Sequence, residues 1–307
     1  MKILYFKHGI KTIWNAIFTL FNIWKFSFWK LCYNWDMRKF AILISNLILL
    51  LLALSMIFPF IVMVYLSFVP TSQIFSHTYG LNLSLDNYRN VFNDIPVLTY
   101  FLNSLIVAVL STIGQVLIAS LAGYAFARFD FKGKNVLFFI ILLTMMIPPQ
   151  VNIIPLFFLM RELHMVNTYS ALIFPALFGG FGIFMMRQFF LGLPKELEES
   201  ALLDGCNLFQ TFFKICLPLA LPAVVTLTIF TFVLNWNSFM WPLIVTSSEG
   251  MRTLPVGFAI FKGSFREITL WGELLVCAVI CIIPVIVVFL AGRKYFINDL
   301  IKGAVKE

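Results

Sequence analysis

The sequence predicts an all-α polytopic membrane protein with about six transmembrane helices. Of its 307 residues, 61% are hydrophobic and only 12% are charged, whereas a soluble domain carries about a quarter charged residues. The apolar residues stand in uninterrupted runs rather than in alternation over ~10 residues, which excludes a transmembrane β-barrel. Because backbone polar groups inside lipid must be bonded within the protein, these runs are expected to be helices.

Residues 1–39 form a separate segment in front of the first expected span. Their apolar residues recur every three or four positions, with Lys and Asn mostly between them, which predicts an amphipathic helix. Its Trp and Lys content suits an interfacial helix on the inner leaflet that serves as a lipid anchor. A regulatory or partner-docking role is the alternative. Residues 40–307 are expected to form one transmembrane domain.

Six stretches without Asp, Glu, Lys or Arg locate the spans of this domain. Each can hold the ~20 apolar residues that cross a bilayer core. Pro148, Pro149 and Pro155 interrupt the third stretch and make it the weakest of the six. The six stretches are residues 40–85, 95–127, 135–160, 163–186, 215–248 and 274–292.

The distribution of charge predicts the orientation of the spans. With a cytoplasmic N-terminus, 17 of the 22 Lys and Arg residues fall in cytoplasmic segments and five in outer loops. This asymmetry fits the positive-inside rule and places both termini in the cytoplasm of a bacterial cell. The net charge of +8 therefore reflects topology and attraction to lipid, and no nucleic-acid partner is expected.

The sequence lacks the motifs of a membrane enzyme. It contains no His-Glu-x-x-His, no G-x-S-x-G and no carboxylate within an expected span. The phosphate-binding pattern G-x-x-x-x-G-K-[ST] is also absent. No catalytic residue, metal site or cofactor is expected, and any ATP hydrolysis must occur on another polypeptide. A membrane-embedded transferase, the alternative from another class, would need clustered His or carboxylates at a membrane face.

The segment 191–218, between the fourth and fifth spans, predicts two short helices that meet at an angle. Acidic residues around Glu199 complement the positive start of the first helix. Gly205 ends that helix because glycine accepts the backbone angles of a sharp reversal. Asn207 can cap a second helix, with Gln210 three residues later as its capping-box partner. This second helix is expected to carry three aromatic rings on one face: Phe209, Phe212 and Phe213.

The spacing in this segment resembles the cytoplasmic coupling loop of ABC-importer permeases, which reads Glu-Ala-Ala, three residues, Gly, nine residues, Ile-x-Leu-Pro. Every anchor is present, with Ser200 in place of the first Ala. In that family the loop fits a cleft on the ATP-binding subunit and transmits its closure; an ordinary amphipathic loop helix on the bilayer is the alternative. The resemblance implies a coupling role for Glu198, Glu199, Ser200, Ala201, Asp204, Gly205, Phe209, Ile215, Leu217 and Pro218.

Four further stretches resemble maltose-type sugar permeases, in particular the second permease of such importers: residues 122–128, 235–243, 253–257 and 303–306. The resemblance covers about residues 90–307 and implies the type I importer fold. It also implies a sugar or oligosaccharide substrate and several partners. These are two ATP-binding subunits, a homologous second permease that completes the path, and an extracytoplasmic solute-binding protein that delivers sugar to the outer loop at 249–266.

Polar side chains within spans are costly and are candidates for a substrate path. Amides and indoles could hydrogen-bond and stack on a sugar, although amides also commonly join neighbouring helices. An importer of glycerol phosphate or another non-sugar solute is the alternative within transport; an anionic substrate would favour a cationic cavity, and no Lys or Arg lies within the expected spans. The path candidates are Asn103, Gln115, Asn152, Asn235, Trp236 and Asn237.

Overall fold

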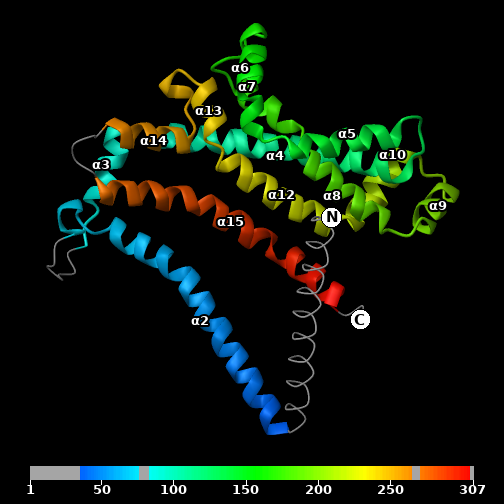
Figure 1. The fold of residues 1–307 in the computed structure, drawn as a ribbon, viewed down its shortest axis with the longest axis horizontal. Helices are drawn as coiled ribbons and strands as arrows, with labels where there is room; N and C mark the ends of the chain where they lie inside the picture. The colour runs from blue at the N-terminus through cyan, green and yellow to red at the C-terminus, as the bar shows by residue number, and fades with distance from the viewer. Residues whose placement is uncertain (1–34, 76–82, 265–269, 305–307) are drawn as a thin grey trace, which may run out of the picture. The chain divides into compact units, whose positions relative to one another are not determined.

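The computed structural model describes residues 35–75, 83–264 and 270–304 (Figure 1). Most of the expected N-terminal segment 1–39 and the last residues of the stretch 303–306 lie outside the described residues. Every secondary-structure element assigned in the described part of the chain is a helix. The α-helices are α2 (Trp35–Ser67), α3 (Asp86–Asp94), α4 (Val97–Arg128), α5 (Lys134–Met146), α6 (Ile153–Glu162), α7 (Tyr169–Ile173), α8 (Gly180–Leu191), α9 (Glu196–Leu203), α10 (Leu208–Thr211), α11 (Leu217–Leu219), α12 (Leu221–Trp236), α13 (Met240–Val245), α14 (Leu254–Ser264) and α15 (Trp271–Ala304).

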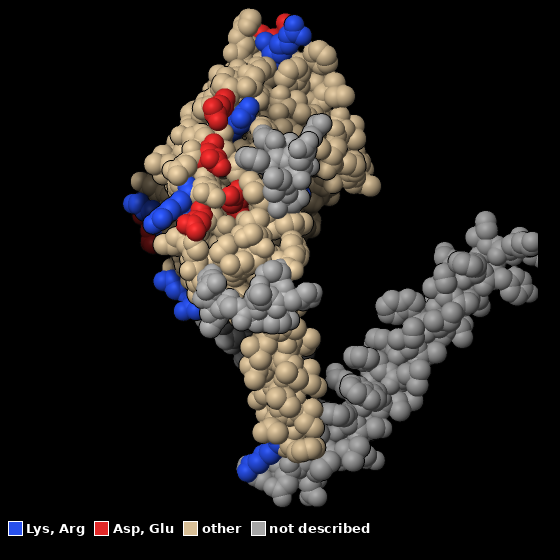
Figure 2. Space-filling model, turned by 90° about the vertical axis from the view of Figure 1, so that its left-hand side faces the viewer, with Lys and Arg blue, Asp and Glu red and all other residues tan. Residues whose placement is uncertain are grey.

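The chain divides into two compact units, residues 1–63 and 64–307. The described part of the first unit is the greater part of α2, whose large apolar side chains are exposed on all sides. A helix that is apolar all round is typical of a membrane span. Figure 2 shows α2 with no charged side chain on the visible face except near its N-terminal end.

The number of spans agrees with the sequence prediction. Among the described residues, four helical segments are long and apolar enough to cross a membrane, and two bent helix pairs bring the total to as many as six. The continuous segments are Lys39–Ser67, Val97–Arg128, Tyr169–Leu191 and Trp271–Tyr295. The first bent pair, Lys134–Met146 with Pro149–Glu162, turns by 96° at the prolines that interrupt the third expected span.

The second bent pair lies where the segment 191–218 enters the fifth span. Here Leu208–Leu219 and Leu221–Trp236 meet at 77°, with Pro218 and Pro222 on either side of Ala220. Two backbone hydrogen bonds meet at the bend, where Ala220 N donates to Cys216 O at 2.9 Å and Val224 N donates to Ala220 O at 2.9 Å. Ala220, at the bend, is fully buried, and the two prolines beside it supply no backbone donor to the helix ladder.

Helix α4 is the centre of the second unit and packs against both α8 and α12, while α12 packs against α15 (Figure 1). Helices α4 and α8 approach each other closely at Gly123. A Cβ atom there would lie 2.7 Å from Met186 Cβ and 2.8 Å from the backbone nitrogen of Arg187. Small residues at such contacts let membrane helices come close enough for extensive packing.

One feature of the last span differs from the sequence prediction, which places no carboxylate inside a span. Helix α15 begins at Trp271, so Glu273 lies in its first turn and is only 3% exposed. Asn90 of α3 donates a hydrogen bond to Glu273 Oε1 at 2.9 Å. The positive end of the helix and the amide donor favour a carboxylate there, whereas burial and the Oε2 atom, which has no partner among the described residues, oppose its charge. Figure 2, which views the α3 and α14 end of the second unit, shows acidic and basic side chains intermingled there.

Candidate functional site

The segment between α8 and α12 forms an elbow, defined here as α9, α10 and the turn that joins them. Gly205 adopts φ +84°, a left-handed conformation that favours glycine. Cys206 N donates to Ala201 O at 3.0 Å and Gly205 N to Leu202 O at 3.1 Å, which is the pair of bonds of a Schellman helix end. The predicted break after the first helix is confirmed.

The second helix of the elbow begins with a complete capping box. Gln210 N donates to Asn207 Oδ1 at 2.9 Å, and Asn207 N donates to Gln210 Oε1 at 3.0 Å. This reciprocal pair satisfies two backbone donors that would otherwise lack partners at the helix start. The predicted cap is therefore confirmed, and both sides of the Gly205 turn are fixed by hydrogen bonds.

The three phenylalanines predicted to share one face differ in exposure. Phe209 is 73% exposed and Phe213 46% exposed, whereas Phe212 is buried. The Phe212 and Phe213 rings contact each other, with 4.8 Å between centroids. The Phe212 ring also packs against Tyr124, with 5.1 Å between centroids, and against Phe190 at 6.2 Å. The Phe212 ring thereby fastens the elbow to α4 and α8.

A buried ion pair makes a second attachment to α4. Arg128, the last residue of α4, pairs through Nε with the Glu198 carboxylate of α9, and their side chains are only 6% and 14% exposed. Tyr124 Oη donates to the other oxygen of Glu198 at 3.0 Å, and Arg128 Nη2 donates to Leu193 O at 2.9 Å. Both carboxylate oxygens of Glu198 are thus engaged within the chain.

The exposed surface of the elbow is apolar at its centre. Leu203 is 89% exposed and Phe209 73% exposed, with Leu202 and Leu208 about half exposed. Exposed carboxylates lie on the same segment, among them Glu199. Exposed large apolar side chains close to charged ones are typical of a protein–protein contact. The four leucine and phenylalanine side chains named here are called the elbow knob below.

The ten residues expected to couple fall into two groups. The side chains of Glu199, Ser200, Asp204 and Phe209 are exposed, and so is Gly205 at the turn. Ala201 is buried, Glu198, Ile215 and Leu217 are half-buried, and Pro218 in α11 is exposed like the first group. The sequence analysis did not single out Leu203. Its position could have done so, because Leu203 is a leucine at the end of an acidic helix, two residues beyond the core residue Ala201.

Two of the substrate-path candidates are engaged in joining elements. Asn103 is buried and donates from its amide to Gly250 O at 2.8 Å and Arg252 O at 2.9 Å. Trp236 is buried, donates from Nε1 to Cys281 O of α15 at 2.9 Å and stacks on Phe232. For these two residues the bonds favour the helix-joining alternative over a path.

The other four path candidates are less enclosed. Asn152 is exposed, Gln115 is half-buried, and Asn237 is exposed and donates to Val233 O at 2.9 Å. Asn235 differs, because its amide nitrogen is buried without a hydrogen-bond partner in the described part of the chain. No hydrogen bond seen among the described residues joins any two of the six candidates.

Residues 115–302 match the family described as binding-protein-dependent transport system inner membrane component. The chain belongs to this family, the permeases of ABC importers, and the match contains the whole elbow. It is 37% identical to the arabinooligosaccharides transport permease AraQ of Halalkalibacterium halodurans, over 83% of this chain and 93% of that one. It is 37% identical to the trehalose/maltose transport permease MalG of Thermococcus litoralis, over 84% and 94%.

The relatives also include a permease named for a phosphorylated solute. The sn-glycerol-3-phosphate permease UgpE of Yersinia pestis is 28% identical over 86% of this chain and 97% of its own. Among solved structures, a chain of a bacterial ABC transporter involved in import of the acidic polysaccharide alginate matches with a TM-score of 0.71. It is 25% identical, and the match covers 86% of this chain and 99% of that one. The prediction of a carbohydrate ABC-importer permease with an all-α fold is confirmed.

Proposed function

We propose that this chain is the transmembrane permease subunit of an ATP-driven, binding-protein-dependent importer of a sugar or oligosaccharide. It lies in the bacterial cell membrane with both termini in the cytoplasm and forms half of the translocation path. A homologous permease forms the other half, two ATP-binding subunits hydrolyse ATP, and an extracytoplasmic binding protein delivers the sugar. The observation that carries this proposal is the capped elbow with its exposed apolar knob.

The elbow is suited to pass on a displacement without absorbing it. Its turn is fixed by the Schellman bonds and the capping box, so the two short helices move together. The Phe212 ring packs against α4 and α8, and the Glu198 carboxylate is held by Arg128 and Tyr124 of α4. When the ATP-binding subunits close, a push on the knob is delivered to packed helices, which shift as rigid bodies.

The substrate we propose is an uncharged sugar. Within the described spans, Lys and Arg occur near the span ends and not in their middle portions, so this chain offers no cationic surface for an anion at mid-membrane. The unpartnered amide of Asn235 is a donor that a sugar hydroxyl could satisfy, and Gln115, Asn152 and Asn237 remain candidates beside it. An importer of glycerol phosphate is the second candidate, favoured by the relative of that name.

The elbow assignment is tested by Leu203→Ala and Phe209→Ala in the assembled transporter. We expect each variant to insert normally, to retain less ATP-binding subunit on purification and to lose most sugar uptake in proteoliposomes. The matched control is Leu191→Ala, since Leu191 is also an exposed leucine, 45% exposed, but lies at the end of α8. Equal subunit retention in the elbow variants and the control would contradict the assignment, as would uptake by the isolated chain.

A further inference from the structure

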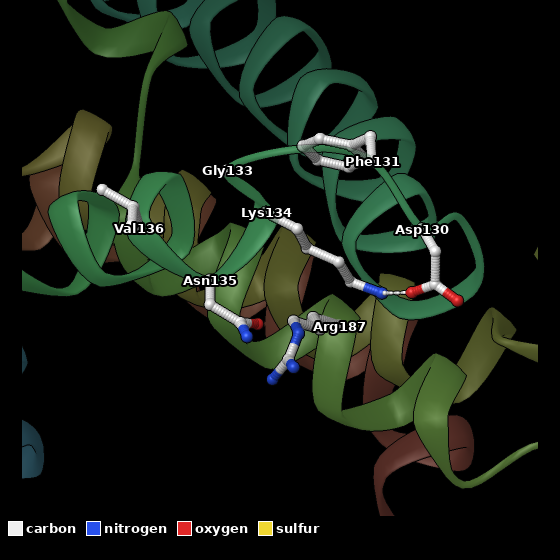
Figure 3. A pocket seen from close by; sticks show the side chains of 7 residues that line it. All are labelled: Asp130, Phe131, Gly133, Lys134, Asn135, Val136 and Arg187. Atoms are coloured by element: carbon white, nitrogen blue, oxygen red, sulfur yellow. Dashed lines mark hydrogen bonds and ion pairs between the residues drawn. The ribbon is translucent and has the colours of Figure 1, made fainter.

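A surface hollow of about 420 Å³ lies beside the turn between α4 and α5 and has no part in the coupling proposed above (Figure 3). The turn and the start of α5 form one wall, and Arg187 of α8 forms the other. The lining residues are Asp130, Phe131, Gly133, Lys134, Asn135, Val136 and Arg187.

The hollow lies at the boundary between lipid and water. Helix α5 has no buried residue, and from its first turn onwards it exposes Val136, Leu137, Phe139 and Ile140 by 48–63%. Such an apolar surface is covered by lipid tails in a membrane-spanning protein. The hollow is at the polar end of this surface, and Arg128, two residues before Asp130, pairs with Glu198 of the elbow. The hollow therefore lies on the same side of the membrane as the elbow, which is the cytoplasmic side in the function proposed above.

The Arg187 side chain is held in place while some of its N–H donors remain unpaired among the described residues. Its Nε donates to Phe126 O at 3.3 Å, and its guanidinium carbon lies 4.1 Å from the centroid of the Phe138 ring. In the described part of the chain its terminal nitrogens have no acceptor. Figure 3 shows the Arg187 and Asn135 side chains pointing toward one another. A fixed guanidinium with free N–H groups is well suited to bind two oxygens of a phosphate.

Lys134 supplies a second cation that is readily released. Its ammonium group bonds to Asp130 Oδ1 at 3.1 Å, as drawn in Figure 3. The Lys134 side chain is 18% exposed, but that of Asp130 is 98% exposed, and an ion pair with so exposed a partner contributes little. Lys132, exposed in the same turn, adds a third positive charge against the single carboxylate. The local balance therefore favours an anion.

We propose that this hollow binds the phosphate of an anionic phospholipid in the cytoplasmic leaflet. Arg187 and Lys134 contact the phosphate oxygens, while Phe131, 41% exposed, and Val136, 63% exposed, contact the glycerol and the first carbons of the acyl chains. Basic recesses between membrane helices on the cytoplasmic side are suited to such headgroups. A bound lipid would link α5 to α8, the helix that leads into the elbow.

The test uses the assembled transporter in nanodiscs that contain equal phosphatidylglycerol and phosphatidylcholine. After gentle detergent extraction, retained lipids are counted by native mass spectrometry. We expect selective retention of phosphatidylglycerol, reduced about fivefold by Lys134→Gln and about fivefold by Arg187→Gln, as for a cation lost near an anionic leaflet. Lys195→Gln is the control, because Lys195 is an exposed cation of the elbow segment outside the hollow.

Asp130→Asn should change lipid retention in the opposite direction, which a misfolded variant would not do. Removal of the competing carboxylate frees Lys134, so retention of phosphatidylglycerol should rise two- to threefold. Retention that is equal in all variants, or lost once the ATP-binding subunits assemble, would overturn the proposal. Displacement of the lipid by millimolar inorganic phosphate or glycerol phosphate would instead assign the hollow to a soluble phosphate and overturn the lipid assignment.

Discussion

Breaking the pair between Arg128 and Glu198 should release the elbow from α4. In Glu198→Ala, the Arg128 guanidinium, 6% exposed, loses its carboxylate and keeps only the bond to Leu193 O. Loss of one partner of a buried pair costs ~3–5 kcal/mol, and the unmatched Tyr124 hydroxyl adds about 1 kcal/mol. Because Arg128 keeps its bond to Leu193 O, we take the low end, about 3 kcal/mol, for the two losses together.

A loss of about 3 kcal/mol raises the population of the detached elbow by roughly 100-fold. Amide hydrogen exchange over residues 196–203 measures this population directly, since opening of the segment exposes its helical amides. We expect amide exchange there to become faster by about that factor, and the amount of sugar transported per ATP hydrolysed to fall. The amides in the middle of α4 should keep their protection.

Two variants separate the pair from a general effect of charge. Glu199→Ala removes an exposed carboxylate one residue away and should leave exchange in the elbow unchanged. The double variant Arg128→Glu with Glu198→Arg restores opposite charges and should recover part of the protection. The reasoning is refuted if the elbow amides exchange at the same rate in Glu198→Ala as in the parent protein, or if Glu199→Ala raises their exchange rate equally.

Three further substitutions address the elbow and the α4–α8 contact. Gly205→Ala should cost about 1–2 kcal/mol through its left-handed backbone angle alone, since no atom lies within 4 Å of the new Cβ; unchanged uptake would argue against a fixed turn. Asn207→Ala should lower thermal stability by about 1 kcal/mol through loss of the cap, and Asn207→Ser should recover most of it. Gly123→Ala should cost about 1–3 kcal/mol by overpacking, measured through the melting temperature of the protein in detergent. Gly192→Ala is the control and should cost less, since the nearest contact of its new Cβ is at 3.4 Å. Equal shifts in melting temperature for the two variants would contradict the close approach of α4 and α8.

The features that sequence reasoning predicted well depend on neighbouring residues. The cap of Asn207 by Gln210 and the reversal at Gly205 are local patterns, and the structure contains both. The number of spans follows from composition alone. The break in the third span follows from its prolines, because these residues lack the backbone donor that would continue the helix.

The features it missed depend on partners distant in the chain. In the sequence, Glu198 is one of several carboxylates in the loop. Only the structure shows that it pairs with Arg128, 70 residues earlier. From the sequence, Trp236 could contact a sugar or join two helices. Its hydrogen bond to the carbonyl of Cys281 in α15 favours the joining role. Phe212 is buried because Tyr124 and Phe190 are there to receive it. Spacing within one helix cannot reveal such partners.

The bend at Ala220 has a mechanical consequence for the whole subunit. Ala220 is fully buried, so packing holds α11 and α12 at the 77° angle between them. A tilt of the short arm beside the elbow then displaces the far end of α12 most, since displacement grows with distance from the bend. Trp236 lies at that end, and its bond to Cys281 O would pass the displacement to α15.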